Sequence, residues 1–162
     1  MEEKKEDKHL VRGKAFEDEL EESHQWYAER GMGVIVRLHV PMAFNRRTGR
    51  ATYLRRTLCD YMGFIGGGRA VLLEAKSLSD KDTKTWKPDR EHQFTALTTA
   101  AQYGAMALYI IRVGTNSARL YTPRYHTFDE HVKLELLPLV SREISSCPWH
   151  WLEEALKITG DG

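Results

Sequence analysis

Apolar residues recur at helical spacing in the first part of the chain. Phe16, Leu20 and Tyr27 fall on one face of a helix over residues 14–30, and Gly31 follows where a C-terminal cap belongs. We therefore predict a first helix over this range. The dozen residues before it carry charges of both signs and few apolar side chains, which predicts a flexible charged tail over residues 1–12.

Shorter segments with β-branched and alternating residues follow the first helix. "VIVRLHV" (34–40) and "ATYLRRTL" (51–58) read as strands joined by the turn "NRRTGR", and they would form a long basic hairpin or a protruding ribbon. "CDYMGFI" and "RAVLLEAKS" form a second hairpin around three consecutive glycines, 66–68.

The second half of the chain returns to helical spacing and then to strands. A helix is expected from Asp89 or Arg90 to Tyr103, with Asp89 as its N-cap. The strands "ALYIIRV" and "ARLYTP" follow. The remainder is expected to be mostly helix and to end in "PWHWLEEALK", with Pro148 in the opening turn. The order of elements predicts an α/β fold.

Composition narrows the class of protein. The length of 162 residues suits a single domain, which we place at 13–162. Cys59 and Cys147 form neither a CxxC pair nor a zinc-type spacing with histidine, so neither a disulfide framework nor a structural zinc site is suggested. The N-terminus lacks an apolar core, and no run approaches the roughly 20 apolar residues that span a bilayer. We expect a cytoplasmic protein.

The net charge of +1 conceals a partition along the chain. Residues 1–29 are rich in acids, whereas residues 31–59 hold six arginines and no acid: Arg37, Arg46, Arg47, Arg50, Arg55 and Arg56. Guanidinium groups match phosphate oxygens in bidentate fashion, so this block suits a phosphate partner. A solvated hairpin would have the same composition, and the charge alone does not decide between the two.

The second hairpin brings two carboxylates together. If it turns on Gly67, then Asp60 faces Glu74 across the strands, and directly opposed side chains repel unless a cation lies between them. Lys76 follows Glu74 by two residues and therefore shares its face, whereas Tyr61, Val71 and Leu73 make the opposite face apolar. Three charged side chains thus converge on one patch of the sheet.

This arrangement suits hydrolysis of a phosphodiester. Carboxylates are the hard ligands that Mg²⁺ prefers, and the ion keeps waters that can attack phosphorus. A lysine beside such a water can orient it, help to deprotonate it or stabilise the charge on the phosphoryl oxygens. A surface Glu-Lys pair with an unrelated aspartate is the alternative. Signatures of other catalytic classes, such as GxSxG, HExxH and a phosphate-binding GxxxxGK[ST], are absent from the sequence.

Asp60 and the triplet 74–76 match the pattern of the PD-(D/E)xK nuclease superfamily. "RGKAFEDELEESHQWYAERGMGVIVRLHVP" (12–41), "DYMGFIGGGRAVLLEAKS" (60–77) and "EHQ" (91–93) further resemble Holliday junction resolvases of the RecU type. Archaeal resolvases of the Hjc type share the same core and stay an alternative grouping. The resemblance implies a restriction-endonuclease-like core, a central mixed β-sheet flanked by helices, and a homodimer that nicks opposed strands of a four-way junction with Mg²⁺, for which Mn²⁺ can substitute.

The resemblance also implies roles for particular residues. Asp60 and Glu74 correspond to metal ligands, with the Ala75 carbonyl assisting. Lys76 corresponds to the catalytic lysine, and Gln93 to a helix residue that helps to position the nucleophile. Glu17 corresponds to an acid that reaches the metal through water; its sequence neighbours are also acidic, and nothing else in the sequence distinguishes it.

The basic segment at about 42–56 corresponds to the stalk of these resolvases, a projection that enters the open centre of the junction. The expected DNA-binding residues are Arg12, Lys14, Arg46, Arg47, Arg50, Arg55 and Arg56. Because no base-reading motif accompanies them, we expect recognition of junction shape. One departure from the family is Cys59, which occupies the position of the proline in the superfamily name.

Three classes of function are compatible with these features. The first is a junction resolvase. The second is another endonuclease of the superfamily, of repair or restriction type. The third is a catalytically inactive DNA-binding accessory protein, against which the intact set of site residues argues. No organic cofactor and no membrane partner are expected.

Overall fold

A computed structural model describes residues 3–39, 42–53, 56–78, 83–143 and 146–160. Its centre is a six-stranded sheet in the order β1-β4-β5-β7-β8-β10. The strands are β1 (Gly33–Arg37), β4 (Tyr61–Ile65), β5 (Arg69–Leu78), β7 (Met106–Val113), β8 (Ser117–Tyr121) and β10 (Leu139–Ser141). β5 and β7 run parallel and the other neighbours run antiparallel, so the sheet is mixed, as predicted.

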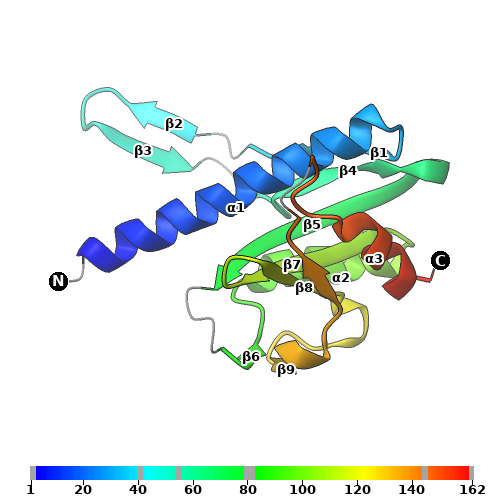
Figure 1. The fold of residues 1–162 in the computed structure, drawn as a ribbon. Coiled ribbons are helices and arrows are strands. Elements are labelled where there is room, and N and C mark those ends of the chain that lie inside the picture. The colour runs from blue at the N-terminus through cyan, green and yellow to red at the C-terminus, as the bar shows by residue number, and fades with distance from the viewer. Residues whose placement is uncertain (1–2, 40–41, 54–55, 79–82, 144–145, 161–162) are drawn as a thin grey trace.

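Helices cover both faces of this sheet (Figure 1). α1 (Glu3–Glu29) and α3 (Trp151–Ile158) pack on one face, and α2 (Glu91–Gln102) packs on the other. Side chains that alternate along β5 enter different cores: Leu73 is buried with α1, whereas Leu72 is buried with α2. β7 is buried along almost its whole length, which is typical of a central strand covered on both sides.

A short hairpin stands apart from the sheet. β2 (Met42–Asn45) and β3 (Arg50–Tyr53) pair only with each other, and they project to the same side of the molecule as the N-terminal end of α1 (Figure 1). The Asn45 side chain accepts hydrogen bonds from the amides of Arg47 and Thr48, and Gly49 adopts a positive φ of 66°, which together close the turn. We call this hairpin the stalk.

The structure corrects the predicted extent of several elements. α1 begins at Glu3, so the segment predicted as a flexible tail is helical from that residue on. The strand predicted over 34–40 ends at Arg37 and pairs with β4 in the main sheet, so it does not form a long hairpin with 51–58. Only the four-residue strands β2 and β3 form the protruding hairpin.

The C-terminal third contains more strand than predicted. After β8 the chain forms the two-residue strand β9 (Val132–Lys133), which pairs with β6 (Thr85–Trp86), and then β10 at the edge of the sheet. α3 begins only at Trp151, so Pro148 precedes the helix. Within the described ranges, no helix is both long and apolar enough to cross a membrane.

Candidate active site

The pairing of β4 with β5 places Asp60 opposite Glu74. Tyr61 faces Leu73 in the antiparallel register, and the Asp60 amide donates a hydrogen bond to the Leu73 carbonyl at 3.1 Å. Asp60 directly precedes this last pair and Glu74 directly follows it, and the two carboxylates lie close enough for their charges to interact, as the position of the turn predicts. The turn itself is a 3₁₀ helix over Gly66–Gly68, where Gly67 and Gly68 both adopt positive φ.

Asp60 closes the end of this ladder with its side chain. Its Oδ2 accepts a hydrogen bond from the Ala75 amide at 2.9 Å, one residue beyond Glu74. β4 begins at Tyr61, so the carboxylate of the preceding residue takes the place that a strand carbonyl would otherwise occupy. The N–H and C=O of one residue in a strand point to the same side, which directs the Ala75 carbonyl toward Asp60 as well.

Glu74 is the most buried acid of the site, with 1% of its surface exposed. Its Oε2 accepts a hydrogen bond from Gln93 Nε2 at 2.9 Å, and its Oε1 lies 3.0 Å from Lys76 Nζ. Burial, together with the nearby charge of Asp60, raises the pKa of Glu74 to about 7, although Lys76 opposes the shift. The carboxylate pair is thus electrostatically costly without an additional cation.

Lys76 is held between two acids. Its Nζ also lies 2.9 Å from Asp89 Oδ1, in the segment that leads into α2. Burial alone would lower the pKa of Lys76, but Glu74 and Asp89 outweigh it, so the pKa lies above its usual value. The ammonium therefore stays protonated, and it suits hydrogen-bond donation and charge stabilisation better than proton abstraction.

Asp89 is a site residue that the sequence analysis missed. It was predicted as the N-cap of α2, but the cap residue is Arg90, without a side-chain hydrogen bond, and Asp89 instead pairs with Lys76. Burial would raise the pKa of Asp89, yet the hydrogen bond and charge of Lys76 lower it on balance. A single acid in a polar loop gives no sequence signal for this pairing.

Glu17 lies near the same end of the sheet but on the helix that covers the other face. It forms an ion pair with Arg37 of β1, which also contacts Glu21 at 3.1 Å. Burial raises the pKa of Glu17, Arg37 opposes this shift, and Asp60 adds to it. The Tyr61 hydroxyl donates to the Glu17 carbonyl at 3.2 Å and ties α1 to β4. Arg37, counted above with the phosphate-binding block, instead neutralises acids of α1.

Cys59 supports the start of β4 from a fully buried position. Its thiol donates to the Tyr61 carbonyl at 3.1 Å, and burial, with further contributions from Glu74 and Asp60, raises the pKa of the thiol to about 12. The residue therefore packs beside the site as a neutral group. The two tryptophans of the C-terminal segment, Trp149 and Trp151, are fully buried in the core.

The oxygen atoms around the carboxylate pair are few and of one chemical kind. Among the residues that the structure describes, no group of three or more His, Cys, Asp or Glu side chains is placed to hold an ion. Two carboxylates and one backbone carbonyl are nevertheless the oxygen donors that suit Mg²⁺, which binds through few protein ligands and retains several waters. The orientation of Ala75 and the mutual repulsion of Asp60 and Glu74 fit this ion.

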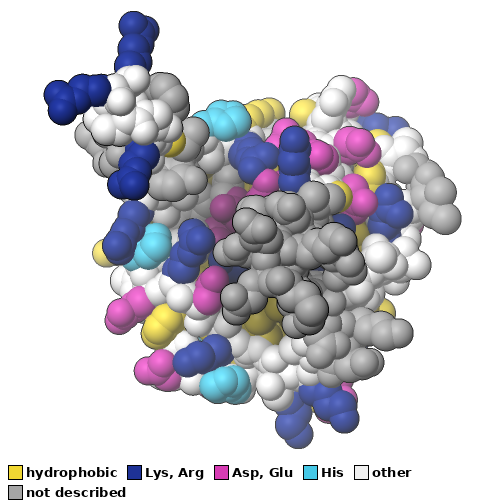
Figure 2. Space-filling model, turned by 90° about the vertical axis from the view of Figure 1, so that its left-hand side faces the viewer, with side chains coloured by type: hydrophobic (Ala, Val, Ile, Leu, Met, Phe, Trp, Pro, Cys, Tyr) yellow, Lys and Arg dark blue, Asp and Glu magenta, His cyan; other side chains and the backbone are white. Residues whose placement is uncertain are grey.

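The predicted DNA-binding residues are distributed over two projections. Arg46, Arg47 and Arg50 are exposed on the stalk, Arg56 is exposed at its base, and Lys14 is exposed on α1. Figure 2 shows basic side chains standing out from the projecting hairpin. Arg55 and the side chain of Arg12 lie outside the described residues, so their predicted roles remain predictions.

Comparisons with known proteins settle the family. The model of the RecU family, described as "Recombination protein U", matches residues 11–156. The chain belongs to the RecU family. Among solved structures, Hjc of Archaeoglobus fulgidus, a Holliday junction resolvase, is similar, with 13% identity and a TM-score of 0.45 over 70% of this chain and 87% of that chain. None of the curated proteins compared with the chain matches it. The expected α/β fold, a central mixed sheet flanked by helices, is confirmed.

The raised pKa of Glu74 predicts a pH-dependent stability. Between its ordinary value of 4.5 and about 7, the folded metal-free chain keeps a proton that the unfolded chain has lost. The stabilising contribution of protonated Glu74 to the free energy of unfolding is therefore fully present below pH 4.5, and it is lost as the pH rises through 7. In EDTA at pH 8, we expect Glu74→Gln to unfold at a higher urea concentration than the wild type, because its free energy of unfolding is larger by up to about 3 kcal/mol.

Urea denaturation at pH 5, 6, 7 and 8 measures this difference. The advantage of Glu74→Gln should shrink toward pH 5, whereas Glu135→Gln, which removes an exposed carboxylate, should leave the curve unchanged. A difference between Glu74→Gln and the wild type that is constant across the range would show that Glu74 does not titrate as described.

Proposed function

We propose that this member of the RecU family is an endonuclease that resolves four-way DNA junctions by nicking opposed strands in the presence of Mg²⁺. The observation that carries the proposal is the carboxylate pair of buried Glu74 and half-buried Asp60, with Lys76 held beside Glu74. Binding of DNA alone requires no opposed carboxylates in a buried position, which argues against an inactive accessory protein.

Asp60, Glu74 and the Ala75 carbonyl would hold the ion. When bound, Mg²⁺ would polarise the phosphoryl oxygens and activate a water toward the phosphorus. Gln93 fixes the orientation of Glu74 through its side-chain amide. The protonated Lys76 is placed to donate to the phosphoryl oxygens or to the attacking water, and Asp89 keeps its ammonium close to Glu74. Glu17, near Asp60, would reach the ion through water.

The stalk supports selection of a junction over other DNA. Its tip carries three exposed arginines and stands clear of the sheet, so it can reach a part of the substrate that the active site does not contact (Figure 1). The contacts that arginine makes to phosphates depend on where the strands run and carry no base information. A repair or restriction type of endonuclease would not need this projection.

Paired nicking requires two active sites, and a homodimer would supply them. A patch on β1 and β4 supports self-association: Val34 and Phe64 face each other in the register, and Val36 lies two residues along. Their exposed fractions are 61%, 62% and 55%, respectively. Contiguous exposed apolar side chains at the edge of a sheet are typical of surfaces that bind protein.

The first test is cleavage of DNA with altered site residues. In Mg²⁺ the wild type should cut a synthetic four-way junction into nicked duplexes and leave linear duplex largely uncut. Asp60→Asn and Lys76→Ala should lower the cleavage rate by about a thousandfold or more, because each removes a ligand or charge from the reacting centre. Both variants should still bind the junction in gel-shift assays.

Asp129→Asn serves as the control, because Asp129 is an exposed carboxylate remote in sequence from the site. Equal cutting of junction and linear duplex by the wild type would refute the resolvase proposal. Loss of junction binding together with cleavage would assign Asp60 and Lys76 a structural role instead.

The second test concerns the stalk. The triple variant Arg46→Ala, Arg47→Ala, Arg50→Ala should bind the junction more weakly, and the slope of log affinity against log salt should fall in magnitude by about 2.7, because three phosphate contacts are lost. Titrations at several salt concentrations measure both quantities.

A matched variant removes three exposed lysines near β6 and β9: Lys84, Lys87 and Lys133. It should change the slope much less. An unchanged affinity and slope in the arginine variant would exclude the stalk from junction binding.

A further inference from the structure

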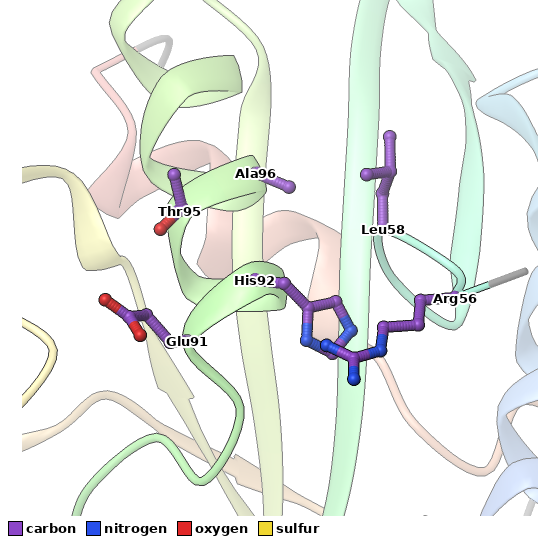
Figure 3. Close-up of a pocket in the computed structure, with 6 residues that line it drawn as sticks. All are labelled: Arg56, Leu58, Glu91, His92, Thr95 and Ala96. Atoms are coloured by element: carbon purple, nitrogen blue, oxygen red, sulfur yellow. The ribbon is translucent and has the colours of Figure 1, made fainter.

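A groove lies between α2 and the segment that leads into β4 (Figure 3). Its volume is about 610 Å³, and its walls come from the segment that leads into β4 and from the first two turns of α2. The lining residues are Arg56, Leu58, Glu91, His92, Thr95 and Ala96. Leu58 precedes Asp60 by two residues, and His92 is adjacent to Gln93, which binds Glu74. The groove is thus lined by close sequence neighbours of two residues of the site proposed above.

The two walls face each other with a definite chemistry. In Figure 3, the side chains of His92 and Ala96 point from α2 toward those of Arg56 and Leu58, whereas Glu91 and Thr95 lie on the other side of the helix. Helical spacing gives the same division, because 92 and 96 share one face and 91 and 95 another. One end of the groove is thus basic, and the other is apolar.

At each end of the groove, one side chain stays exposed. Arg56 is exposed, and it makes no ion pair or hydrogen bond with any other residue that the structure describes. Leu58 exposes 52% of its surface, although the residue that follows it is fully buried. A guanidinium beside an imidazole suits an anion, and an exposed leucine opposite an alanine suits a flat apolar group.

A nucleotide has an anionic part and an apolar part of this kind. Its phosphate is an anion that accepts hydrogen bonds from guanidinium and imidazole, and its sugar and base present apolar faces on which side chains pack. We propose that the groove holds one nucleotide of the cleaved strand next to the scissile phosphate, with the phosphate at Arg56 and His92 and the sugar and base against Leu58 and Ala96. This inference rests on the proposed nuclease function and adds the position of the substrate strand.

The consequence concerns alignment of the substrate. A strand held in the groove would enter the site from the side of Gln93 and Asp60, so that its next phosphate reaches the carboxylates. Arg56 and His92 would then act as positioning residues, because they touch a neighbouring phosphate and not the reacting atoms. Their loss should lower both junction affinity and the single-turnover rate, since a misplaced strand presents its phosphorus poorly.

Chemically modified junctions test this contact directly. A neutral methylphosphonate is placed at each phosphate flanking the scissile one in turn, and an abasic site at each flanking nucleotide. Affinity and single-turnover cleavage are measured for the wild type, Arg56→Ala, His92→Ala and Leu58→Ala. At one flanking position, neutralisation of the phosphate should lower the affinity and the single-turnover rate of the wild type about tenfold.

Coupling between variant and modification gives the decisive result. On unmodified DNA, Arg56→Ala and His92→Ala should each lower the junction affinity and the single-turnover rate about tenfold. The methylphosphonate should lower these two quantities little further in either variant. Leu58→Ala should behave in the same way toward the abasic site. Arg56→Lys, which keeps the charge, should restore part of the loss. His131→Ala, which removes an exposed histidine outside the groove, should retain the full effect of each modification.

Fully additive losses at both flanking positions would overturn the inference, as would wild-type behaviour of all three variants on unmodified DNA. Thermal unfolding of each variant identifies any that fails to fold. If the wild type cuts linear duplex as readily as a junction, the resolvase proposal fails, and the coupling is measured on the duplex instead. If it cuts no DNA, the coupling is measured in affinity alone.

Discussion

The opposition of Asp60 and Glu74 is the constraint on which the rest of the site depends. The pairing of β4 with β5 and the hydrogen bond from the Ala75 amide hold Asp60 close to Glu74, and the burial of Glu74 removes water that would screen the two charges. The surrounding groups respond to this repulsion: Lys76 and Gln93 bind Glu74, and the Ala75 amide binds Asp60. In the metal-free chain this compensation is incomplete, because the pKa of Glu74 remains raised.

The two faces of the sheet contribute differently to this site. α2 brings Gln93 over the carboxylates, and the segment before it brings Asp89 to Lys76, so this face holds the reacting groups. α1 packs on the opposite face and is tied to β4 through Tyr61. Two of its acids, Glu17 and Glu21, pair with Arg37, which lowers the negative charge that α1 presents near the site.

Much of this arrangement could be predicted from the sequence, because it follows from local periodicity. A strand has a period of two and a glycine turn has a definite centre, so a common face for Asp60, Glu74 and Lys76 follows from counting, and the register confirms the predicted centre of the turn. The turn of the stalk was predicted in the same way, from the glycine in "NRRTGR". Gln93 was found through resemblance, and its contact with Glu74 gives that assignment a physical basis.

The predictions failed where contacts join distant parts of the chain without a local pattern. Asp89 looked like a helix cap because the sequence shows only its position before α2, whereas its partner Lys76 lies thirteen residues earlier. Arg37 was counted in the arginine block without being assigned to DNA, and its pairing with Glu17 and Glu21 was not foreseen because it depends on how α1 crosses β1. The short strands β9 and β10 have too few residues for alternation to reveal them.

The most direct test of the account is the binding of a divalent ion by the carboxylate pair in the absence of DNA. Calorimetric titration with Mg²⁺, or EPR titration with Mn²⁺, should show one site per chain at pH 8 and weaker binding at pH 6, where a proton on Glu74 competes. Asp60→Asn and Glu74→Gln should each abolish this site, and Asp129→Asn should retain it. Unchanged binding in Asp60→Asn would contradict the account.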